Sequence, residues 1–372
     1  AHLKVILTWT PSPTSNVVGY NVRATDGITP IGPALLGNVT ANTVLGLTNG
    51  TAYTFDVRAR DVDGDESDPV TVIASPVPNI SIGGTGYPTL AAALAAAQNG
   101  DTVQLGAEPY VITATHVVRE GVSLRGLSPH QTRLDATGLA AAIAVVSDGD
   151  GGITTLSLLT VFGAAIGIHV QDAQGVVLRN LVIRDNAQSG VELGGFATAS
   201  LTNATLAGNG TGVRSCGVVD VRNCLVVDNQ VGLSAKGSGA VHSRYDNFDR
   251  NHSAAYENVA AGTGDLAERV VFLNEAAKDY RVPQGGITND AGDPQDDYSL
   301  EPAPNGGRID LGAFGNTALA ASASSGSVST PGTSSSSCSA VAAAPGSTMS
   351  ALWPFGALFL ALAFSILRRP PA

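Results

Sequence analysis

Short runs of aliphatic residues return at a regular spacing between Gly175 and Ala235, and Asn and Gly residues separate them. The three segments are LRNLVIRDNAQSGVEL, LTNATLAGNGTGVRS and VRNCLVVDNQVGLSA. Their first asparagines, Asn180, Asn203 and Asn223, are 23 and 20 residues apart. A unit of this length is too short for a pair of helices, and its β-branched residues and Asn/Gly corners are typical of strands joined by tight turns. The pattern predicts a parallel β-solenoid with one unit per coil.

The aligned aliphatic positions are expected to face inward and to stack at about 4.8 Å per coil. These positions are Leu178, Leu201 and Val221, then Ile183, Leu206 and Val226, then Val191, Val213 and Leu233. We expect the first asparagine of each unit to form a second internal stack, because its side-chain amide can hydrogen-bond to the coils above and below. The sequence therefore predicts an amide ladder made of Asn180, Asn203 and Asn223.

Residues 1–76 alternate hydrophobic and polar positions in short strands, with a turn at Asn49-Gly50. This pattern predicts a small antiparallel sandwich. Trp9, the GYNVR segment that begins at Gly19, and the LTNGTAY run from Leu47 to Tyr53 resemble a fibronectin type III domain. The resemblance implies a tyrosine corner formed by Leu47 and Tyr53.

Residues 77–316 are expected to contain the solenoid. The alanine-rich stretch at 88–99 is the one good helical pattern in the folded part, and a short apolar helix can cap the hydrophobic end of a coil stack. This helix, the GDTV segment after it and the VSLRG strand resemble the entry of the pectin-lyase-like right-handed β-helix proteins. The resemblance implies an all-β fold with a right-handed, single-stranded parallel β-helix. It also implies a closing segment at 266–316, in which PNGGRIDLGAFG covers the last coil.

The composition changes after the folded part. Residues 317–350 consist mostly of Ala, Ser, Gly and Thr, which predicts a disordered linker. Residues 351–372 contain an uncharged apolar stretch followed by Arg368 and Arg369, which predicts a transmembrane helix with the arginines on the cytoplasmic side.

Cys338, the apolar stretch and the terminal arginine pair resemble the MYXO-CTERM carboxy-terminal sorting signals. The resemblance implies that an intramembrane sorting protease acts near Cys338, and that the protein is exported and displayed on the cell surface. A simple tail anchor is the alternative interpretation of the same segment.

The net charge of the chain excludes some classes of partner. The net charge is −11 and only 14% of residues are charged, which argues against nucleic acid or an anionic membrane surface as the main partner. An extracellular polysaccharide or a cell-surface component is the expected partner.

Two sets of polar residues are candidates for chemistry. Those that follow the Gly-aliphatic pairs would form a column on one face of the solenoid: His169, Glu192, Arg214 and Ser234. The others lie in the last coil: Arg244, Asp246, Asp249, Arg250 and His252. The simpler interpretations are a solvated ladder of alternating charges for the first set and a closure of the stack for the second.

No cofactor is expected, and Ca²⁺ is the metal that three acidic loops could hold. The first loop contains Asp61, Asp63 and Asp65, the second contains Asp148 and Asp150, and the third runs over residues 290–297. The first loop departs from an EF-hand because its Gly comes directly after the second Asp. In an oxidising compartment Cys216 and Cys224 could form a disulfide.

Two functions follow from these patterns. Inverting glycosidases need two carboxylates on neighbouring coils, and here the position of Asp185 aligns with Phe162, Gly208 and Asp228. Aligned carboxylates do not recur in adjacent coils, and the tail resembles a sorting signal. The favoured hypothesis is therefore an exported, surface-anchored protein that binds carbohydrate or a surface component without catalysis. The alternative is a polysaccharide lyase or glycoside hydrolase that acts on extracellular polysaccharide.

Overall fold

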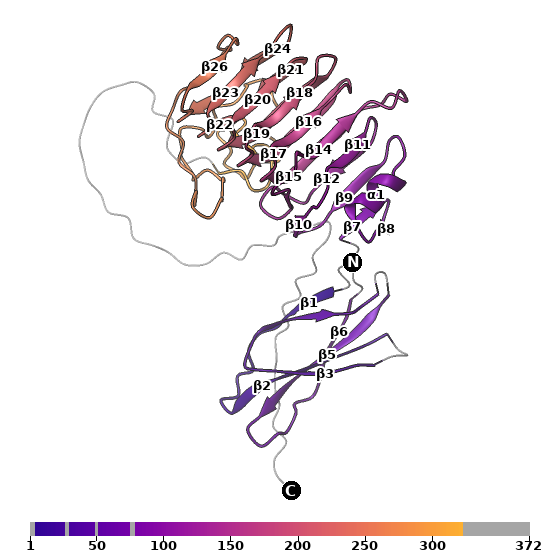
Figure 1. Cartoon of the computed structure of the whole chain (residues 1–372). Helices are drawn as coiled ribbons and strands as arrows, with labels where there is room; N and C mark the ends of the chain where they lie inside the picture. Colours follow the sequence, from indigo (N-terminus) through magenta and orange to yellow (C-terminus); the bar gives the residue numbers. More distant parts are fainter. Residues whose placement is uncertain (1–3, 27–29, 49–50, 75–78, 323–372) are drawn as a thin grey trace, which may run out of the picture.

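The computed structural model describes residues 4–26, 30–48, 51–74 and 79–322. Its amino-terminal part is a sandwich of two antiparallel sheets (Figure 1). One sheet pairs β1 with β4, and the other has the order β3-β2-β5-β6. The strands are β1 (Lys4–Thr8), β2 (Val17–Thr25), β3 (Pro30–Leu36), β4 (Ala41–Leu45), β5 (Tyr53–Asp61) and β6 (Val70–Ala74).

The core of the sandwich follows the predicted alternation. In β5 every second residue from Tyr53 to Ala59 is buried. Trp9 packs against Tyr20 with their ring centroids 5.3 Å apart. The Tyr53 hydroxyl accepts a hydrogen bond from the backbone N–H of Thr48 at 3.0 Å, beside fully buried Leu47. The tyrosine corner that the resemblance implied is therefore present.

The second part is a parallel β-solenoid of seven coils with three strand faces (Figure 1). The first face contains β9 (Thr102–Leu105), β12 (Ser123–Arg125), the first halves of β15 (Thr155–Phe162), β17 (Val176–Arg184) and β19 (Thr198–Ala207), then β21 (Val218–Arg222) and β24 (Ala240–Arg244). The second face contains β10 (Pro109–Val111), β13 (Arg133–Asp135), the second halves of β15, β17 and β19, then β22 (Leu225–Val227) and β25 (Asn247–Asp249). The third face contains β11 (His116–Arg119), β14 (Ala141–Val146), β16 (Ile166–Val170), β18 (Ser189–Leu193), β20 (Thr211–Ser215), β23 (Val231–Ala235) and β26 (Ala254–Glu257).

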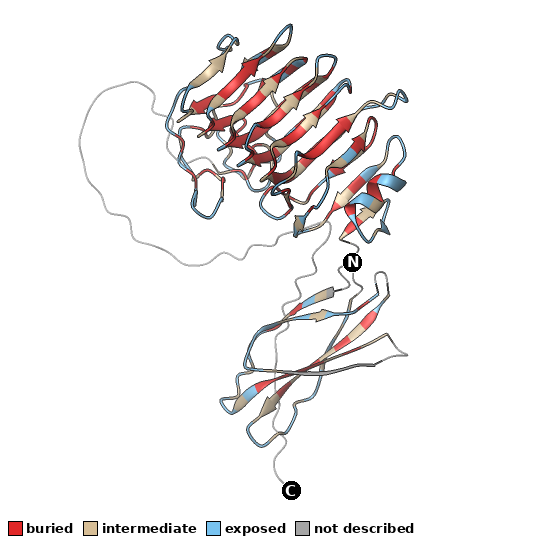
Figure 2. Ribbon diagram, in the orientation of Figure 1, coloured by how far each residue is buried: buried red, intermediate tan, exposed pale blue. Residues whose placement is uncertain are grey.

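The inward aliphatic stacks form as predicted. Leu178 pairs with Leu201 and Leu201 with Val221 in the register of the first face. The corresponding stacks on the other two faces pair in the same way, and all their members are fully buried. Figure 2 shows the resulting continuous core along the solenoid. Each such Leu, Ile or Val contributes about 1.5–3 kcal/mol of hydrophobic stabilisation.

The predicted amide ladder is wrong in its residues. Asn180, Asn203 and Asn223 lie at the corner between the first and second faces, with φ of 51°, 51° and 57°. This left-handed conformation is one that Asn tolerates better than other side chains. Their side chains bond to the chain segment that follows the last coil and not to one another.

The ladder is formed by the second asparagine of each unit, at the corner between the second and third faces. The Oδ1 atom of Asn209 accepts from the backbone N–H of Asn186 at 3.1 Å and from its Nδ2 at 2.9 Å. Asn229 Oδ1 accepts from the same two groups of Asn209, and Asn251 Oδ1 from those of Asn229. Each side chain therefore satisfies buried backbone groups in the neighbouring coil.

The start of the solenoid is capped. A short hairpin of β7 (Ile80–Ile82) and β8 (Thr85–Gly86) precedes α1 (Leu90–Ala96), and β7 pairs antiparallel with β9. The hydroxyl of Thr89 accepts from the N–H of Ala92 at 3.1 Å and so caps the helix. Leu90, Ala93 and Leu94 are buried in the core of the coil stack, which fits the capping role expected for residues 88–99.

Residues beyond β26 close the last coil. The N–H of Tyr245 donates to the carbonyl of Thr263, and the N–H of Phe248 to that of Leu266, at 3.0 and 2.9 Å. These bonds add an incomplete eighth rung to the stack.

The chain then follows the side of the solenoid, so the expectation that PNGGRIDLGAFG covers the last coil is wrong. We call residues 270–322 the side segment. Its apolar residues bury the outward side chains of the second face: Val182, Ala207, Leu225 and Val227 pack with Val270, Phe272, Tyr280, Val282, Leu311, Ala313 and Phe314. A strand with aliphatic residues on both sides needs a cover on its outer side, and the side segment supplies it.

In the part of the chain described above, no helix is long and apolar enough to span a membrane. The predicted transmembrane helix at 351–372, Cys338, Arg368, Arg369 and nearly all of the linker at 317–350 lie outside the described residues.

Candidate functional site

A shallow groove of about 510 Å³ runs over several coils at the corner between the second and third faces. The corner residues have positive φ values and follow one another from coil to coil: Gly163, Asp185, Gly208, Asp228 and Arg250. The groove is lined by the buried ladder residues Asn186 and Asn209 and by Asp185, Asp228, Gln230 and His252. The ladder thus lies directly beneath the groove.

The alignment of Asp185 differs by one residue from the sequence-based one. Phe162 is level with Arg184, so Asp185 is level with Gly163 and not with Phe162. Gly208 and Asp228 occupy the same corner in the next two coils, as expected. One coil lies between the corners that carry Asp185 and Asp228, so their backbone positions are two coil spacings, or about 10 Å, apart.

Gly208 occupies the corner between these two residues, so the coil between them carries no carboxylate there. It has φ +67° and no side chain, and a Cβ atom at this position would lie 3.0 Å from Oδ1 of Asp185. The Asp185 carboxylate therefore lies directly beside this corner, and a side chain at Gly208 would contact it.

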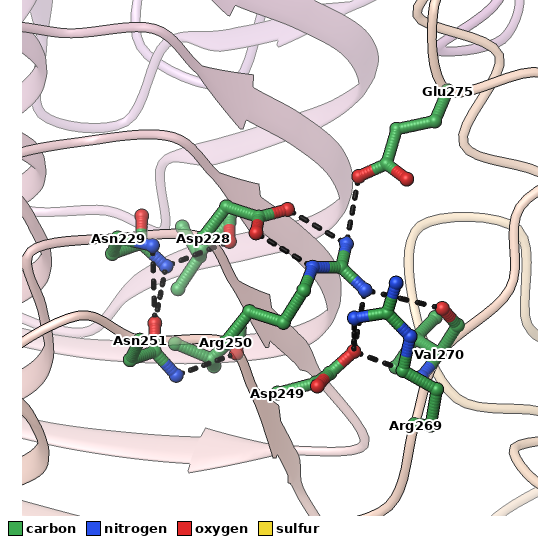
Figure 3. A network of polar contacts seen from close by, with 10 residues as sticks. Asp228, Asn229, Asp249, Arg250, Asn251, Arg269, Val270 and Glu275 are labelled. Carbon is green, nitrogen blue, oxygen red and sulfur yellow. Dashed lines mark hydrogen bonds and ion pairs between the residues drawn. The ribbon is translucent and has the colours of Figure 1, made fainter.

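Both groove carboxylates are paired with cations. Figure 3 shows Arg250 donating from Nε and Nη2 to the two oxygens of Asp228, at 2.6 and 2.7 Å. Burial raises the pKa of Asp228, but the hydrogen bonds and charge of Arg250 outweigh it and hold that pKa below its ordinary range. Asp185 pairs with Arg184 at 2.5 Å and with Lys278 of the side segment at 3.3 Å.

Arg250 also joins the groove to the side segment. Its Nη2 donates to Oε1 of Glu275 at 2.7 Å, and its Nη1 pairs with Asp249 at 2.6 Å. Asp249 in turn accepts from the N–H of Val270 at 3.0 Å and lies 3.6 Å from Arg269. One guanidinium therefore fixes both the groove wall and the point where the side segment begins (Figure 3).

The predicted column on the third face is present. His169, Glu192, Arg214 and Ser234 are level with one another, and Glu257 continues the column. Arg214 lies 3.9 Å from Glu192, which also accepts from the hydroxyl of Ser189 at 2.9 Å. Glu257 pairs with Lys236 and accepts from Ser234, both at 2.6 Å, and these two partners hold its pKa below the ordinary range. The charged residues Glu192, Arg214 and Glu257 of this column therefore each have a partner of opposite charge.

Asp246 and Asp249 do not form one site. Asp246 is fully buried at the corner before β25 and accepts from the N–H of Cys224 at 2.7 Å and the hydroxyl of Ser243 at 2.8 Å. Burial, with a smaller contribution from the charge of Asp265, raises the pKa of Asp246 to about 8. Asp249 is at the other end of β25 and belongs to the Arg250 network. Both residues hold the last coil together.

The first acidic loop forms no ligand set. Oδ1 of Asp61 accepts from the N–H groups of Asp63 and Asp65, at 3.1 and 2.9 Å, and so stabilises its own turn. Within the described residues, the acidic side chains close enough to share an ion are Asp290, Glu301 and Asp310. Asp290 begins the third acidic loop, but Glu301 and Asp310 come from later turns of the side segment.

The disulfide considered between Cys216 and Cys224 is not formed. Cys224 is fully buried in the solenoid core, and its thiol donates to the carbonyl of Arg222 at 3.2 Å.

Comparisons with known proteins support the two folds. Residues 3–73 match the family model of the fibronectin type III domain. Residues 144–267 match the model of the right handed beta helix region. No curated protein sequence matches the chain.

Three solved structures are similar to the chain at low identity. The Agl-KA catalytic domain has 13% identity and a TM-score of 0.33, over 71% of this chain and 67% of that one. The catalytic unit of an α-1,3-glucanase from Streptomyces thermodiastaticus has 14% identity and a TM-score of 0.34, over 70% of this chain and 61% of that one. The pectate lyase Pel3 from Pectobacterium carotovorum has 12% identity and a TM-score of 0.20, over 72% of this chain and 81% of that one.

Proposed function

We propose that the solenoid binds an extended carbohydrate chain along the corner groove and does so without catalysis. The observation that carries the proposal is the groove itself, in which Asp185, Gln230 and His252 project from different coils beside the asparagine ladder. Carboxylate, amide and imidazole groups can all hydrogen-bond to sugar hydroxyls. Because the ladder is buried and hydrogen-bonded from coil to coil, the backbone that carries these groups needs little reordering when a ligand binds.

The state of the groove carboxylates favours binding over hydrolysis. A glycosidase needs one carboxylic acid that stays protonated until it reaches the leaving group. Asp228 has a lowered pKa and a two-point contact with Arg250, and Asp185 contacts two cations. The acids with a raised pKa in the described part of the chain are Asp246, Asp290, Glu301 and Asp310, and none of these lines the groove.

The competing function is hydrolysis or lysis of a polysaccharide. One feature favours it: the backbone positions of Asp185 and Asp228 are about 10 Å apart, comparable to the ~6.5–9.5 Å that separates the carboxyl groups of inverting glycosidases. Such an enzyme would require Asp228 to be released from Arg250 when substrate binds.

Binding can be tested by affinity electrophoresis of the whole chain in gels that contain neutral or uronate polysaccharides. We expect retardation by at least one polymer and a loss of affinity of about tenfold or more in Gly208→Asn. Asn tolerates φ +67°, and its Cβ, 3.0 Å from Oδ1 of Asp185, would displace this groove carboxylate. Arg179→Ala, an exposed change on the first face, is the control. Equal retardation of Gly208→Asn and the unchanged protein would refute the groove as the binding site.

Catalysis is tested in the same mixtures by following new reducing ends and the absorbance of unsaturated uronates. Product that disappears in Asp228→Asn would replace the binding function with hydrolysis, and unsaturated product that disappears in Arg214→Ala would replace it with lysis. The absence of product together with groove-dependent retardation supports binding.

The second part of the proposal concerns location. Export and anchoring at the cell surface are supported by the sequence of the tail, with Cys338 before an apolar stretch and Arg368 and Arg369 after it. The partners of this tail would be the membrane and a sorting protease. In Cys338→Ala we expect the protein to be secreted or to stay in the inner membrane, and unchanged surface display in cell fractionation would contradict the proposal.

A further inference from the structure

Three carboxylates of the side segment meet in one place, although they are far apart in the sequence. Asp290, Glu301 and Asp310 each offer an oxygen, and these oxygens all lie within 4.8 Å of one another. Glu301 and Asp310 are only 5% and 2% exposed, and Asp290 is half-buried. Bringing three negative charges together away from water is unfavourable unless something compensates them.

The hydrogen bonds of the cluster leave one buried oxygen without a partner. Asp310 accepts from the N–H of Asp290 at 2.8 Å and from that of Ala321 at 3.1 Å. Oε1 of Glu301 accepts from the N–H groups of Asp310 and Asn316, at 2.9 and 2.7 Å. Oε2 of Glu301 is buried and has no hydrogen-bond partner among the described residues. An unsatisfied buried carboxylate oxygen is rare in folded proteins and calls for a bound water or ion.

No basic side chain of the described chain forms an ion pair with the three carboxylates. The nearby guanidinium of Arg308 donates to the carbonyls of Ala291 and Gly292, at 3.0 and 2.9 Å. The loop also leaves room for the Asp290 carboxylate, because a Cβ atom at Gly306 would lie 2.0 Å from its Oδ2. The cluster thus has oxygen ligands, negative charge and an unused buried acceptor, but no ion pair with a basic side chain of the described residues.

We infer that Asp290, Glu301 and Asp310 bind a Ca²⁺ ion. Carboxylate oxygens are the ligands that this hard cation prefers, and it accepts irregular geometry with water or carbonyl groups in the remaining positions. Two oxygens that each lie about 2.4 Å from a shared Ca²⁺ can be up to about 5 Å apart, which matches the spacing of the cluster. An all-carboxylate set does not suit Zn²⁺, which prefers Cys and His ligands.

The ion would fasten the side segment onto the solenoid. Its three ligands belong to three separate turns, and the carbonyl of Asp310 also accepts from Nδ2 of Asn203 at 2.9 Å. The same stretch continues to Leu311 and Phe314, which cover the second face. Calcium at this point would therefore control how firmly the cover is held, independently of any ligand in the groove.

The experiment uses the whole chain after treatment with EDTA and subsequent dialysis. Equilibrium dialysis against radioactive CaCl₂ should show one saturable calcium ion per chain, and calcium well above its Kd should raise the unfolding temperature of the solenoid by about 3 °C or more. Glu301→Gln keeps the acceptor that bonds to Asp310 and Asn316 but removes the charge. It should lose the saturable ion and the calcium-dependent rise.

Two controls separate a calcium site from a structural carboxylate. In EDTA the Glu301→Gln protein should unfold at the same temperature as the unchanged protein or at a higher one, because one repelling charge is gone. A purely structural Glu301 would instead make the variant less stable in EDTA as well as in calcium. Asp63→Asn, in the acidic loop of the sandwich, should keep the ion. Absence of saturable calcium binding, or binding that survives in both Glu301→Gln and Asp290→Asn, would overturn the inference.

Discussion

The second and third faces of the solenoid are built by the same coils but end in opposite surfaces. Outward residues of the second face, such as Val182, Ala207 and Val227, are aliphatic and lie beneath the side segment. Outward residues of the third face, such as Glu192 and Arg214, are charged and partly exposed. The inward residues of both faces are aliphatic, so they determine only how the coils stack. The outward residues decide which face is covered by the side segment and which stays exposed to solvent.

The largest effect is expected from placing a charge under the cover. Val182 is 3% exposed and packs against the side segment, so Val182→Asp should lower the free energy of unfolding by about 4 kcal/mol or more. His169→Ala, on the open third face, should change it by less than about 0.5 kcal/mol. Urea unfolding measures both. Similar losses in the two variants would mean that the faces do not differ as described.

A second large effect is expected from the asparagine ladder, which supports both faces at their shared corner. Asn209→Ala removes four buried hydrogen bonds, two that its Oδ1 accepts from Asn186 and two that its Nδ2 donates to Ile183 and Asn229. Unsatisfied buried groups should cost about 3 kcal/mol in unfolding free energy. Asn209→Asp is the matched variant, since it keeps the acceptor and loses the donor. A loss below that of an exposed substitution would refute the ladder.

The sequence predicted the inward stacks of the solenoid but not which asparagine of each unit forms the ladder. The inward aliphatic stacks followed from spacing alone, because a buried strand face constrains residue type at each second position. Asn180 and Asn186 fit the same repeat equally well, however. Only the backbone distinguishes the left-handed corner of Asn180 from the ladder position of Asn186.

The repeat pattern could not predict contacts between segments that are far apart in the sequence. The LVIR, ATLA and LVVD stretches are apolar on both sides, which could have indicated a cover, but nothing in them identifies residues 270–322 as that cover. The groove had a signal in Gly208 between two acidic corners. Of the Asp290 cluster, only Asp290 lies in an acidic loop that the sequence indicated, because Glu301 and Asp310 come from separate turns.

The closed end of the stack should respond to pH through Asp246. Its pKa is about 8 in the fold and about 4 in an unfolded chain, so between these values the folded state binds more protons. Stability should therefore fall as pH rises through this window, with a slope that approaches about 1.4 kcal/mol per pH unit. Unfolding in urea at several pH values measures the slope. It should become shallower in Asp246→Asn, and an unchanged slope would contradict this assignment.

A smaller loss, about 1 kcal/mol, is expected when one anchor of the cover is removed. Asn180 donates from Nδ2 to the carbonyls of Ala313 and Gly315, at 3.2 and 2.8 Å. Asn180→Gly keeps the left-handed corner and removes both bonds. Limited proteolysis should cut the side segment sooner while the coil stack stays resistant. Simultaneous loss of both parts would mean that the cover and the stack unfold as one unit.

The smallest effect is expected on the open face, in the column of paired charges. The side chain of Arg214 is 42% exposed and lies 3.9 Å from Glu192. Because solvent screens such an ion pair, Arg214→Ala should change the free energy of unfolding by less than about 0.5 kcal/mol. The matched change is Arg250→Ala, because Arg250 makes shorter contacts to Asp228, Asp249 and Glu275 and is 20% exposed. Its loss should cost several times more and should also free the side segment for proteolysis. If Arg214→Ala proved as damaging as Arg250→Ala, the third face would be a structural surface like the second, and the contrast between the two faces would be refuted.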